Sequence, residues 1–196
     1  MITFLEETLI KIKKDYHDIS KLTIILPSKR ACGFLLNYLK SHNNKTSFAP
    51  KIISIEEFIE EVSNIKIIDS TELLFESYKV YLKTSPNQDK DSFDVYATWA
   101  NTLLNDFNEI DRYLIPTKPF FNYLSSIQDI NYWYVQDEKT ELIENYLKFW
   151  NSLSSFYETL KKTLLNKNIG YQGIVYREAS ENINHYKKTK RNTPHV

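Results

Sequence analysis

The spacing of apolar residues divides the chain into two parts that meet near residue 68. In the first part, segments with apolar residues three and four positions apart alternate with short apolar runs, as helices alternate with buried strands. Beyond it, only the helical spacing continues. The elements predicted for the first part are helices at residues 3–16, 29–39 and 54–62 and strands at residues 22–26 and 51–53. This order predicts parallel strands joined by helical crossovers.

The stretch from Leu22 to Leu39 reads as one strand that leads directly into one helix. Its first five residues, LTIIL, suit a strand buried on both faces, and Ser28 is placed to cap the following helix. Lys29 and Arg30 occupy the first turn, where cations oppose the helix macrodipole at a cost of roughly a few tenths of a kcal/mol each. Two interpretations stay open. Either both side chains are solvated, or they face an anion such as a nucleic-acid backbone at the carboxyl end of the strand.

A second strand and helix follow a polar loop at residues 43–47. Pro50 ends the loop, and Ser54 and Glu57 have the spacing of a capping box, in which each side chain satisfies a backbone N–H of the other residue. The first 68 residues therefore predict the sheet-containing part of an α/β protein that is mostly helical.

From residue 69 to residue 186 the pattern predicts a helical domain. Asp69 begins it with capping chemistry. Helices are expected at residues 69–82, 92–113, 120–127, 138–166 and 174–186, with a loop at residues 84–90, a break marked by Pro116 and Pro119, and an aromatic connector at residues 129–135. The remaining residues, 187–196, form a basic tail that we expect to be frayed. The predicted domains are thus 1–68 and 69–186, followed by this tail.

Composition favours long helices and limits the available chemistry. The 196 residues include 14 Tyr and 11 Phe but only 3 Gly, which favours helices over a turn-rich β fold. The formal net charge is zero, so a nucleic-acid contact would require a local basic patch. Cys32, the one cysteine, excludes an internal disulfide and is expected to be a small buried hydrophobe. The sequence has no signal peptide and no long apolar window, so we expect a cytoplasmic protein without a membrane role.

Motifs for nucleotide or metal chemistry are not found. Because glycine occurs only at positions 33, 170 and 173, neither GxxxxGK[ST] nor GxGxxG can be present, which excludes ATP binding through a P-loop in this chain. The histidines lack the spacing of metal ligands, and there is no GxSxG elbow, although sequence alone does not exclude a Ser-His-Asp triad. We therefore predict no cofactor, no metal and no catalytic residue.

Acidic residues in the segment LLNDFNEIDRYL are the remaining candidates for chemistry. Asp106 and Glu109 lie three positions apart on one side of a helix, close to Asp111. This spacing suits a divalent cation or, more simply, a solvated flank beside the apolar stripe. The triplet at residues 137–139, Asp-Glu-Lys, matches the end of a PD-(D/E)xK nuclease motif, but it is predicted to begin a helix rather than to lie on a strand.

The many aromatic residues allow two interpretations. They could form stacking platforms for single-stranded nucleic acid. Most of them fall on the predicted helical stripes, however, which favours packing in the core.

Five segments of the chain, taken in order, resemble the N-terminal region of a bacterial helicase–nuclease of the AddB/RexB-like PD-(D/E)xK nuclease family. They are LTIILPSKRACGFLLNYL, PKIISIEEFI, LLFESYKVY, WANTLLNDFNEIDRYLI and IGYQGIVYRE, and the resemblance extends over about residues 3–183. It implies a partial RecA-like parallel sheet, similar to the first motor domain of a helicase, followed by a helical subdomain.

The resemblance also implies a binding site. LPSKRA takes the place of helicase motif Ia, which lies along single-stranded DNA, so Ser28, Lys29 and Arg30 are the implied nucleic-acid-binding residues. The segment SIEEF resembles a later T-x-H-S-F-like element, but Glu56 stands where that element has histidine, which puts a DNA contact there in doubt.

Two departures limit what the resemblance implies. An active motor has a P-loop ahead of its first strand, where this chain has the predicted helix at residues 3–16. Family members carry their nuclease near the C-terminus, so that activity is not carried over. The first hypothesis is a non-catalytic, helicase-like segment of a DNA end-processing protein in double-strand break repair, which binds single-stranded DNA or a helicase partner subunit. The alternative is a freestanding helical protein-interaction module without a DNA role.

Overall fold

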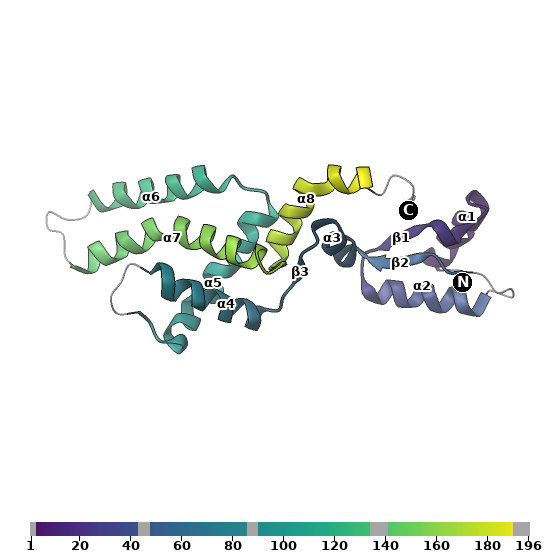
Figure 1. Ribbon diagram of the computed structural model, residues 1–196, viewed down its shortest axis with the longest axis horizontal. Helices are drawn as coiled ribbons and strands as arrows, with labels where there is room; N and C mark the ends of the chain where they lie inside the picture. Colours follow the sequence, from purple (N-terminus) through teal and green to yellow (C-terminus); the bar gives the residue numbers. More distant parts are fainter. Residues whose placement is uncertain (1–2, 43–47, 86–89, 134–140, 190–196) are drawn as a thin grey trace. The chain divides into compact units, whose positions relative to one another are not determined.

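The computed structural model describes residues 3–42, 48–85, 90–133 and 141–189, most of which are helical (Figure 1). These residues divide into unit 1, which holds the chain up to Ser63 and again from Glu181, and unit 2, which holds Asn64–Ser180. The predicted boundaries were residues 68 and 186. The helical content and the small parallel sheet match the predicted mostly helical α/β class.

Unit 1 is built on two parallel strands. Its elements are α1 (Phe4–Asp15), η1 (Ile19–Lys21), β1 (Thr23–Leu26), α2 (Lys29–His42), β2 (Lys51–Ser54) and α3 (Ile55–Ser63). Strands β1 and β2 pair in register from Thr23 opposite Lys51 to Leu26 opposite Ser54. The core between α1, α2 and the strands consists of Leu9, Ile12, Leu22, Ile24, Leu35 and Leu39. Both the strands and the helices of this part are therefore confirmed, with shifts of one to three residues at their ends.

Local capping explains where the helices of unit 1 begin. The predicted capping box is present: the backbone N–H of Ser54 donates to Glu57 Oε2 at 2.9 Å, and the backbone N–H of Glu57 donates to Ser54 Oγ at 3.2 Å. The Ser28 hydroxyl accepts a hydrogen bond from the backbone N–H of Ala31 at 3.2 Å. Each cap satisfies N–H groups that the first helical turn leaves without an intrahelical acceptor.

Unit 2 contains the longer helices. Its elements are β3 (Lys66–Ile67), α4 (Ser70–Thr84), α5 (Phe93–Arg112), α6 (Thr117–Trp133), α7 (Glu141–Leu165), β4 (Ile169–Gly170) and the first part of α8 (Gln172–Thr189). Helix α7 packs against both α4 and α6. Asp69 caps α4 by accepting from the backbone N–H groups of Thr71 and Glu72, as predicted.

Aromatic side chains fill much of the core of unit 2. The ring of Tyr96 is fully buried and contacts Tyr81 and Trp99, at centroid distances of 4.9 and 4.8 Å. Its hydroxyl donates to Ser77 Oγ at 2.8 Å, and burial raises the pKa of Tyr96 to about 12. A second group of rings surrounds Phe107. Core packing, rather than nucleic-acid stacking, is thus the use of these aromatic residues.

Two predictions for unit 2 were wrong. Strands do not stop at residue 68, because β3 and β4 pair in parallel with Lys66 opposite Ile169 and Ile67 opposite Gly170. Two-residue strands are too short for a pattern of period two to be recognised. Helix α6 is also longer than the predicted 120–127 and includes residues 129–133, which were expected to be a connector. Pro119 lies in its first turn, where a missing N–H costs little.

The last helix was underestimated as well. Helix α8 begins at Gln172 and extends to Thr189, so residues 187–189 are helical rather than part of a frayed tail. Lysines in the last turn favour this extension, since cations stabilise the carboxyl end of a helix. The second part of α8 belongs to unit 1, where Tyr186 is buried and its ring meets Phe58 edge-on at 5.7 Å.

Several predictions fall outside the described residues or are only partly met. The loop at residues 43–47, most of the loop at residues 84–90, the Asp-Glu-Lys triplet at residues 137–139 and residues 190–196 lie outside them. Cys32 is half-buried rather than fully buried, and this burial raises the pKa of its thiol. Within the described ranges, every helix is too short or too polar to pass through a lipid bilayer.

Candidate functional site

The three residues predicted to bind nucleic acid lie at one edge of the sheet in unit 1. Ser28, Lys29 and Arg30 follow β1 and are all exposed. The amino end of α3 lies at the same edge, because β1 and β2 are parallel and end opposite each other. We call Ser28, Lys29 and Arg30 the basic edge. In open α/β sheets the carboxyl edge is where ligands bind.

Among the described residues, Lys29 lies close to a carboxylate and Arg30 lies close to an aromatic ring. Lys29 Nζ lies 3.8 Å from Glu57 Oε1, and the two side chains are 69% and 40% exposed. The pKa of Glu57 is lowered, first by the hydrogen bond from the Ser54 backbone N–H, then by that from the Ser54 hydroxyl, and after these by Lys29. The Arg30 guanidinium lies 5.7 Å from the centre of the Phe34 ring. An exposed ion pair of this kind contributes about 0–1 kcal/mol, so a phosphate can compete for Lys29.

The SIEEF segment at the same edge has structural roles in this fold. Ser54 caps α3, and Phe58 packs edge-on against Tyr186. Glu56, the residue at which the segment departs from the helicase element that it was predicted to resemble, is exposed. Ser54 and Phe58 thus support α3, and Glu56 places an exposed carboxylate beside them.

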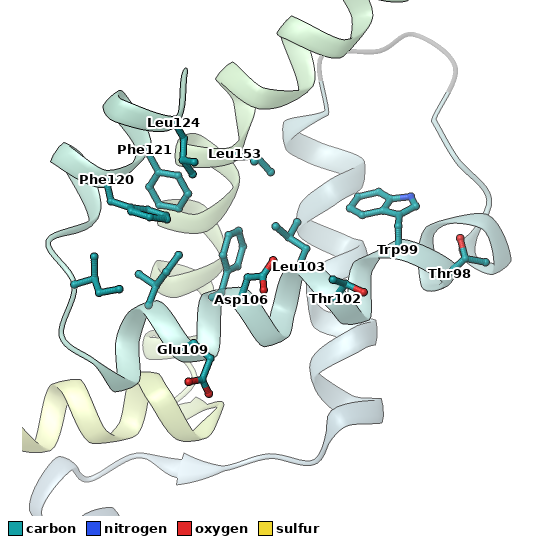
Figure 2. A pocket seen from close by; sticks show the side chains of 13 residues that line it. Thr98, Trp99, Thr102, Leu103, Asp106, Glu109, Phe120, Phe121, Leu124 and Leu153 are labelled. Atoms are coloured by element: carbon teal, nitrogen blue, oxygen red, sulfur yellow. The ribbon is translucent and has the colours of Figure 1, made fainter. Parts of the chain in front are cut away.

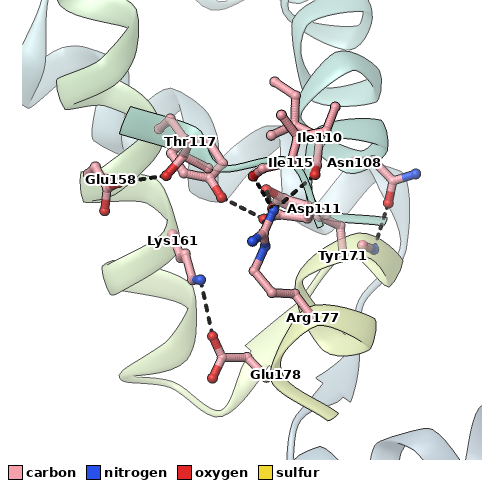
Figure 3. A network of polar contacts seen from close by, with 12 residues as sticks. Asn108, Ile110, Asp111, Ile115, Thr117, Glu158, Lys161, Tyr171, Arg177 and Glu178 are labelled. Carbon is pink, nitrogen blue, oxygen red and sulfur yellow. Dashed lines mark hydrogen bonds and ion pairs between the residues drawn. The ribbon is translucent and has the colours of Figure 1, made fainter. Parts of the chain in front are cut away.

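A buried polar network joins the segments WANTLLNDFNEIDRYLI and IGYQGIVYRE in unit 2 (Figure 3). Asp111, with no exposed surface, lies at its centre. One carboxylate oxygen, Oδ1, accepts hydrogen bonds from the Tyr157 hydroxyl at 2.5 Å and from Arg177 Nε at 2.6 Å, while Oδ2 accepts from the Tyr171 hydroxyl. Burial and the adjacent carboxylate raise the pKa of both tyrosines, so each hydroxyl keeps its proton and remains a donor.

The network also fixes the turn after α5. Arg177 Nη2 donates to the carbonyl oxygens of Ile110 and Ile115, at 3.0 and 2.8 Å. These carbonyls lie on either side of Leu114, whose φ of 54° is in the left-handed region. The backbone N–H of Ile115 returns to the Ile110 carbonyl at 2.9 Å, which closes α5 with a Schellman motif. Arg177 thereby holds the end of α5 against α8.

Close approach of α8 to α5 requires glycine at position 173. A Cβ there would lie 2.2 Å from the backbone oxygen of Asn108, and the Gly173 N–H donates to Asn108 Oδ1 at 2.8 Å. Lys161 and Glu178 add an ion pair between α7 and α8 at 3.1 Å. The network therefore has the geometry of a structural joint that connects α5, α7 and α8.

Sequence reasoning grouped Asp111 with Asp106 and Glu109 and missed its burial. A signal was available, because Asp111 follows the buried Leu104 by seven positions and the buried Phe107 by four, which puts it on the same helix face. A charged residue on an apolar stripe indicates a buried partner. The identity of that partner, Arg177, could not be read from the pattern, since 66 positions separate the two residues.

Asp106 and Glu109 instead lie on the wall of an open groove in unit 2 (Figure 2). The groove encloses about 720 Å³ and is formed by α5, the turn after it, α6 and α7. Its walls are mainly apolar, and the large apolar side chains that line it include Trp99, Leu103, Phe120, Phe121, Leu124 and Leu153. Sequence reasoning missed the groove, because it depends on which helix faces meet.

Metal binding finds no support in the described part of the chain, where no group of three or more His, Cys, Asp and Glu side chains is arranged to hold an ion. No protein-family model matches the sequence, and no curated protein is similar to it. The resemblance to AddB/RexB-like proteins therefore remains a prediction.

Proposed function

We propose that this chain is a non-catalytic, helicase-like segment of a DNA end-processing protein, in which Ser28, Lys29 and Arg30 contact the backbone of single-stranded DNA. The observation that carries the proposal is that two exposed cations follow β1 at the carboxyl edge of a parallel strand pair. Stability does not favour cations in the first turn of a helix, so a role with an anion explains them better. The Ser28 hydroxyl adds a hydrogen-bonding group beside them.

A binding role without catalysis agrees with the rest of the chain. With glycine only at positions 33, 170 and 173, the sequence has no P-loop to hold ATP. In this proposal unit 1 is the partial RecA-like element, unit 2 is the helical subdomain, and ATP hydrolysis falls to a helicase partner subunit.

The expected binding is weak and depends on salt. The net charge of the chain is zero, so the affinity rests on the local cations. For single strands, the slope of log K against log salt concentration changes by about 0.7 for each phosphate that a cation neutralises. Lys29 and Arg30 together should therefore account for about 1.4 of that slope.

The test is fluorescence anisotropy with a labelled oligo-dT at several salt concentrations. Lys29→Ala/Arg30→Ala should weaken binding and flatten the salt dependence by about 1.4. The matched control is Lys11→Ala/Lys14→Ala, which removes the same charge from exposed positions on α1 of the same unit and should bind as the unsubstituted protein does. Absence of binding, or equal losses in both variants, would contradict the proposal.

A substitution at Glu57 provides a second test, in which DNA binding is expected to become stronger rather than weaker. Glu57→Gln keeps a hydrogen-bond acceptor for the Ser54 cap but removes the charge that faces Lys29. It should strengthen DNA binding, whereas Glu56→Gln, an exposed change in the same helical turn, should have a smaller effect. Glu57→Gln binding more weakly than Glu56→Gln would argue against a phosphate at Lys29.

The second candidate function is a helical protein-interaction module without a DNA role. The observation that favours it is the apolar groove, which is formed by residues of unit 2, whereas the basic edge belongs to unit 1. Loss of DNA binding in all tests would leave this second function as the better one.

A further inference from the structure

The groove of unit 2 has a rigid aromatic wall. The indole N–H of Trp99 donates to Asp91 Oδ2 at 3.1 Å, and its ring meets Tyr96 and Tyr81 edge-on, at centroid distances of 4.8 and 5.7 Å. These contacts hold the Trp99 ring in one position beside the groove (Figure 2). An aromatic side chain that is already ordered loses little entropy when a partner binds, which is a property of binding hot spots.

The opposite wall is formed by α6. Phe121 is buried, and Phe120 and Leu124 are half-buried, so apolar surface remains open to an occupant. The volume of about 720 Å³ is within the range of roughly 300–1,000 Å³ that is usual for ligand pockets. This space accommodates several large apolar side chains along the length of α5.

The charge of the groove is entirely negative. Among the described residues that line it, only Asp106 and Glu109 are charged. Glu109 lies 3.6 Å from Arg112 across an exposed pair, whereas the Asp106 carboxylate has no ion-pair or hydrogen-bond partner within the described ranges. Carboxylates beside an apolar groove repel phosphates, which disfavours nucleic acid and anionic lipid as its occupant.

We propose that this groove binds an amphipathic helix of a partner protein that carries lysine or arginine beside its apolar face. Large apolar side chains of that helix enter between Trp99 and the α6 wall, as in other helix-in-groove complexes. Its cations pair with Asp106 and Glu109, which are three positions apart on α5 and so lie on one face. A matching pair of cations is three or four positions apart on the partner helix. The inference holds whether or not the basic edge binds DNA.

The probe is a synthetic amphipathic peptide of about 15 residues, long enough to form a helix, with leucines at i, i+3, i+4 and i+7 and lysines beside them. A second peptide has glutamate in place of each lysine. Binding to the full chain is followed by tryptophan fluorescence and by calorimetry at low salt. The lysine peptide should bind, and the glutamate peptide should bind more weakly, by up to about fivefold for each ion pair lost.

Charge reversal at Asp106 tests the ionic part. Asp106→Lys should weaken binding of the lysine peptide and strengthen binding of the glutamate peptide. Asp94→Lys, an exposed change on the same helix outside the groove, should leave the preference for the lysine peptide unchanged. Equal binding of both peptides to Asp106→Lys and to the unsubstituted protein would overturn the proposal.

Filling the groove tests the apolar part. Thr102 is exposed and lines the groove, whereas its neighbour Asn101 is exposed and does not. Thr102→Trp should abolish peptide binding and Asn101→Trp should not, with circular dichroism as the check that both variants fold. Failure of the lysine peptide to bind, its displacement by oligo-dT, or self-association that Thr102→Trp abolishes would each overturn the proposal.

Discussion

Removal of Arg177 tests how far the buried network stabilises unit 2. The change is Arg177→Met, which keeps a long side chain of similar helix propensity but removes the charge and its donors. Asp111 then keeps only the two tyrosine hydroxyls, and the Ile115 carbonyl loses its hydrogen bond from Arg177. The Ile110 carbonyl keeps the N–H of Ile115.

The expected loss follows from these contacts. A hydrogen bond to a charged group contributes about 1.5–3 kcal/mol, and the half-buried Ile115 carbonyl adds a cost toward the lower end of the about 1–3 kcal/mol for a fully buried group. The free energy of unfolding should therefore fall by about 3–5 kcal/mol, which agrees with the usual cost of breaking a buried ion pair. Since domains are stable by roughly 5–15 kcal/mol in total, the variant should be markedly destabilised.

Urea unfolding followed by tryptophan fluorescence measures this loss, since all three tryptophans, at positions 99, 133 and 150, belong to unit 2. The control is Arg112→Met, which breaks the exposed pair with Glu109 and should cost no more than about 1 kcal/mol. The double variant with Asp111→Asn should lose less than the sum of the single variants. A loss for Arg177→Met as small as that for Arg112→Met would refute the structural role of the network.

Two further predictions concern packing and pH. Gly173→Ala should destabilise unit 2 by about 1–3 kcal/mol in urea unfolding, because its Cβ would lie 2.2 Å from the backbone oxygen of Asn108, whereas Gly33→Ala, with no atom within 4 Å, should stabilise α2 by about 0.5–1 kcal/mol; equal effects would contradict the close approach. Hydrogen bonds from Lys167 and then from Lys79 hold the pKa of Glu76 below its ordinary value of 4.5. The ionised Glu76 therefore stabilises the folded state fully above pH 4.5, and this contribution is lost as the pH falls through the lowered pKa. Thermal unfolding between pH 7 and pH 3 should therefore show a smaller acid-induced decrease in Tm for Glu76→Gln than for the unsubstituted protein, and equal decreases would argue against these contacts.

Sequence patterns predicted the features that depend on neighbouring residues. Ser28, Asp69 and the Ser54–Glu57 capping box were identified correctly because the atoms of a cap are separated by only a few residues. The strands β1 and β2 were recognisable because each is a short apolar run bounded by polar residues or proline. The strands β3 and β4 were missed because each has only two residues, which is a single period of the alternation that identifies a strand.

For the candidate sites, too, local features were predicted and contacts between distant residues were not. The basic edge was predicted because Lys29 and Arg30 follow a strand directly, so their position depends on local structure alone. The pairing of Lys29 with Glu57 was not predicted, since it depends on the register of β1 against β2. The acidic residues of α5 were identified as candidates. Which of them are buried and which are exposed depends on the neighbouring helices and could not be predicted.

Taken by itself, the sequence determined the helix caps, the longer strands and most of the helices of this protein, its mostly helical class and the lack of a P-loop. Only the tertiary structure decided that Asp111 meets Arg177, that Gly173 lets α8 approach α5, and that α5, α6 and α7 leave an apolar groove with an acidic wall. The physical reason is that periodicity reports which face of a helix is apolar, whereas packing selects the face that it meets. Contacts between residues far apart in the sequence arise only from that second choice.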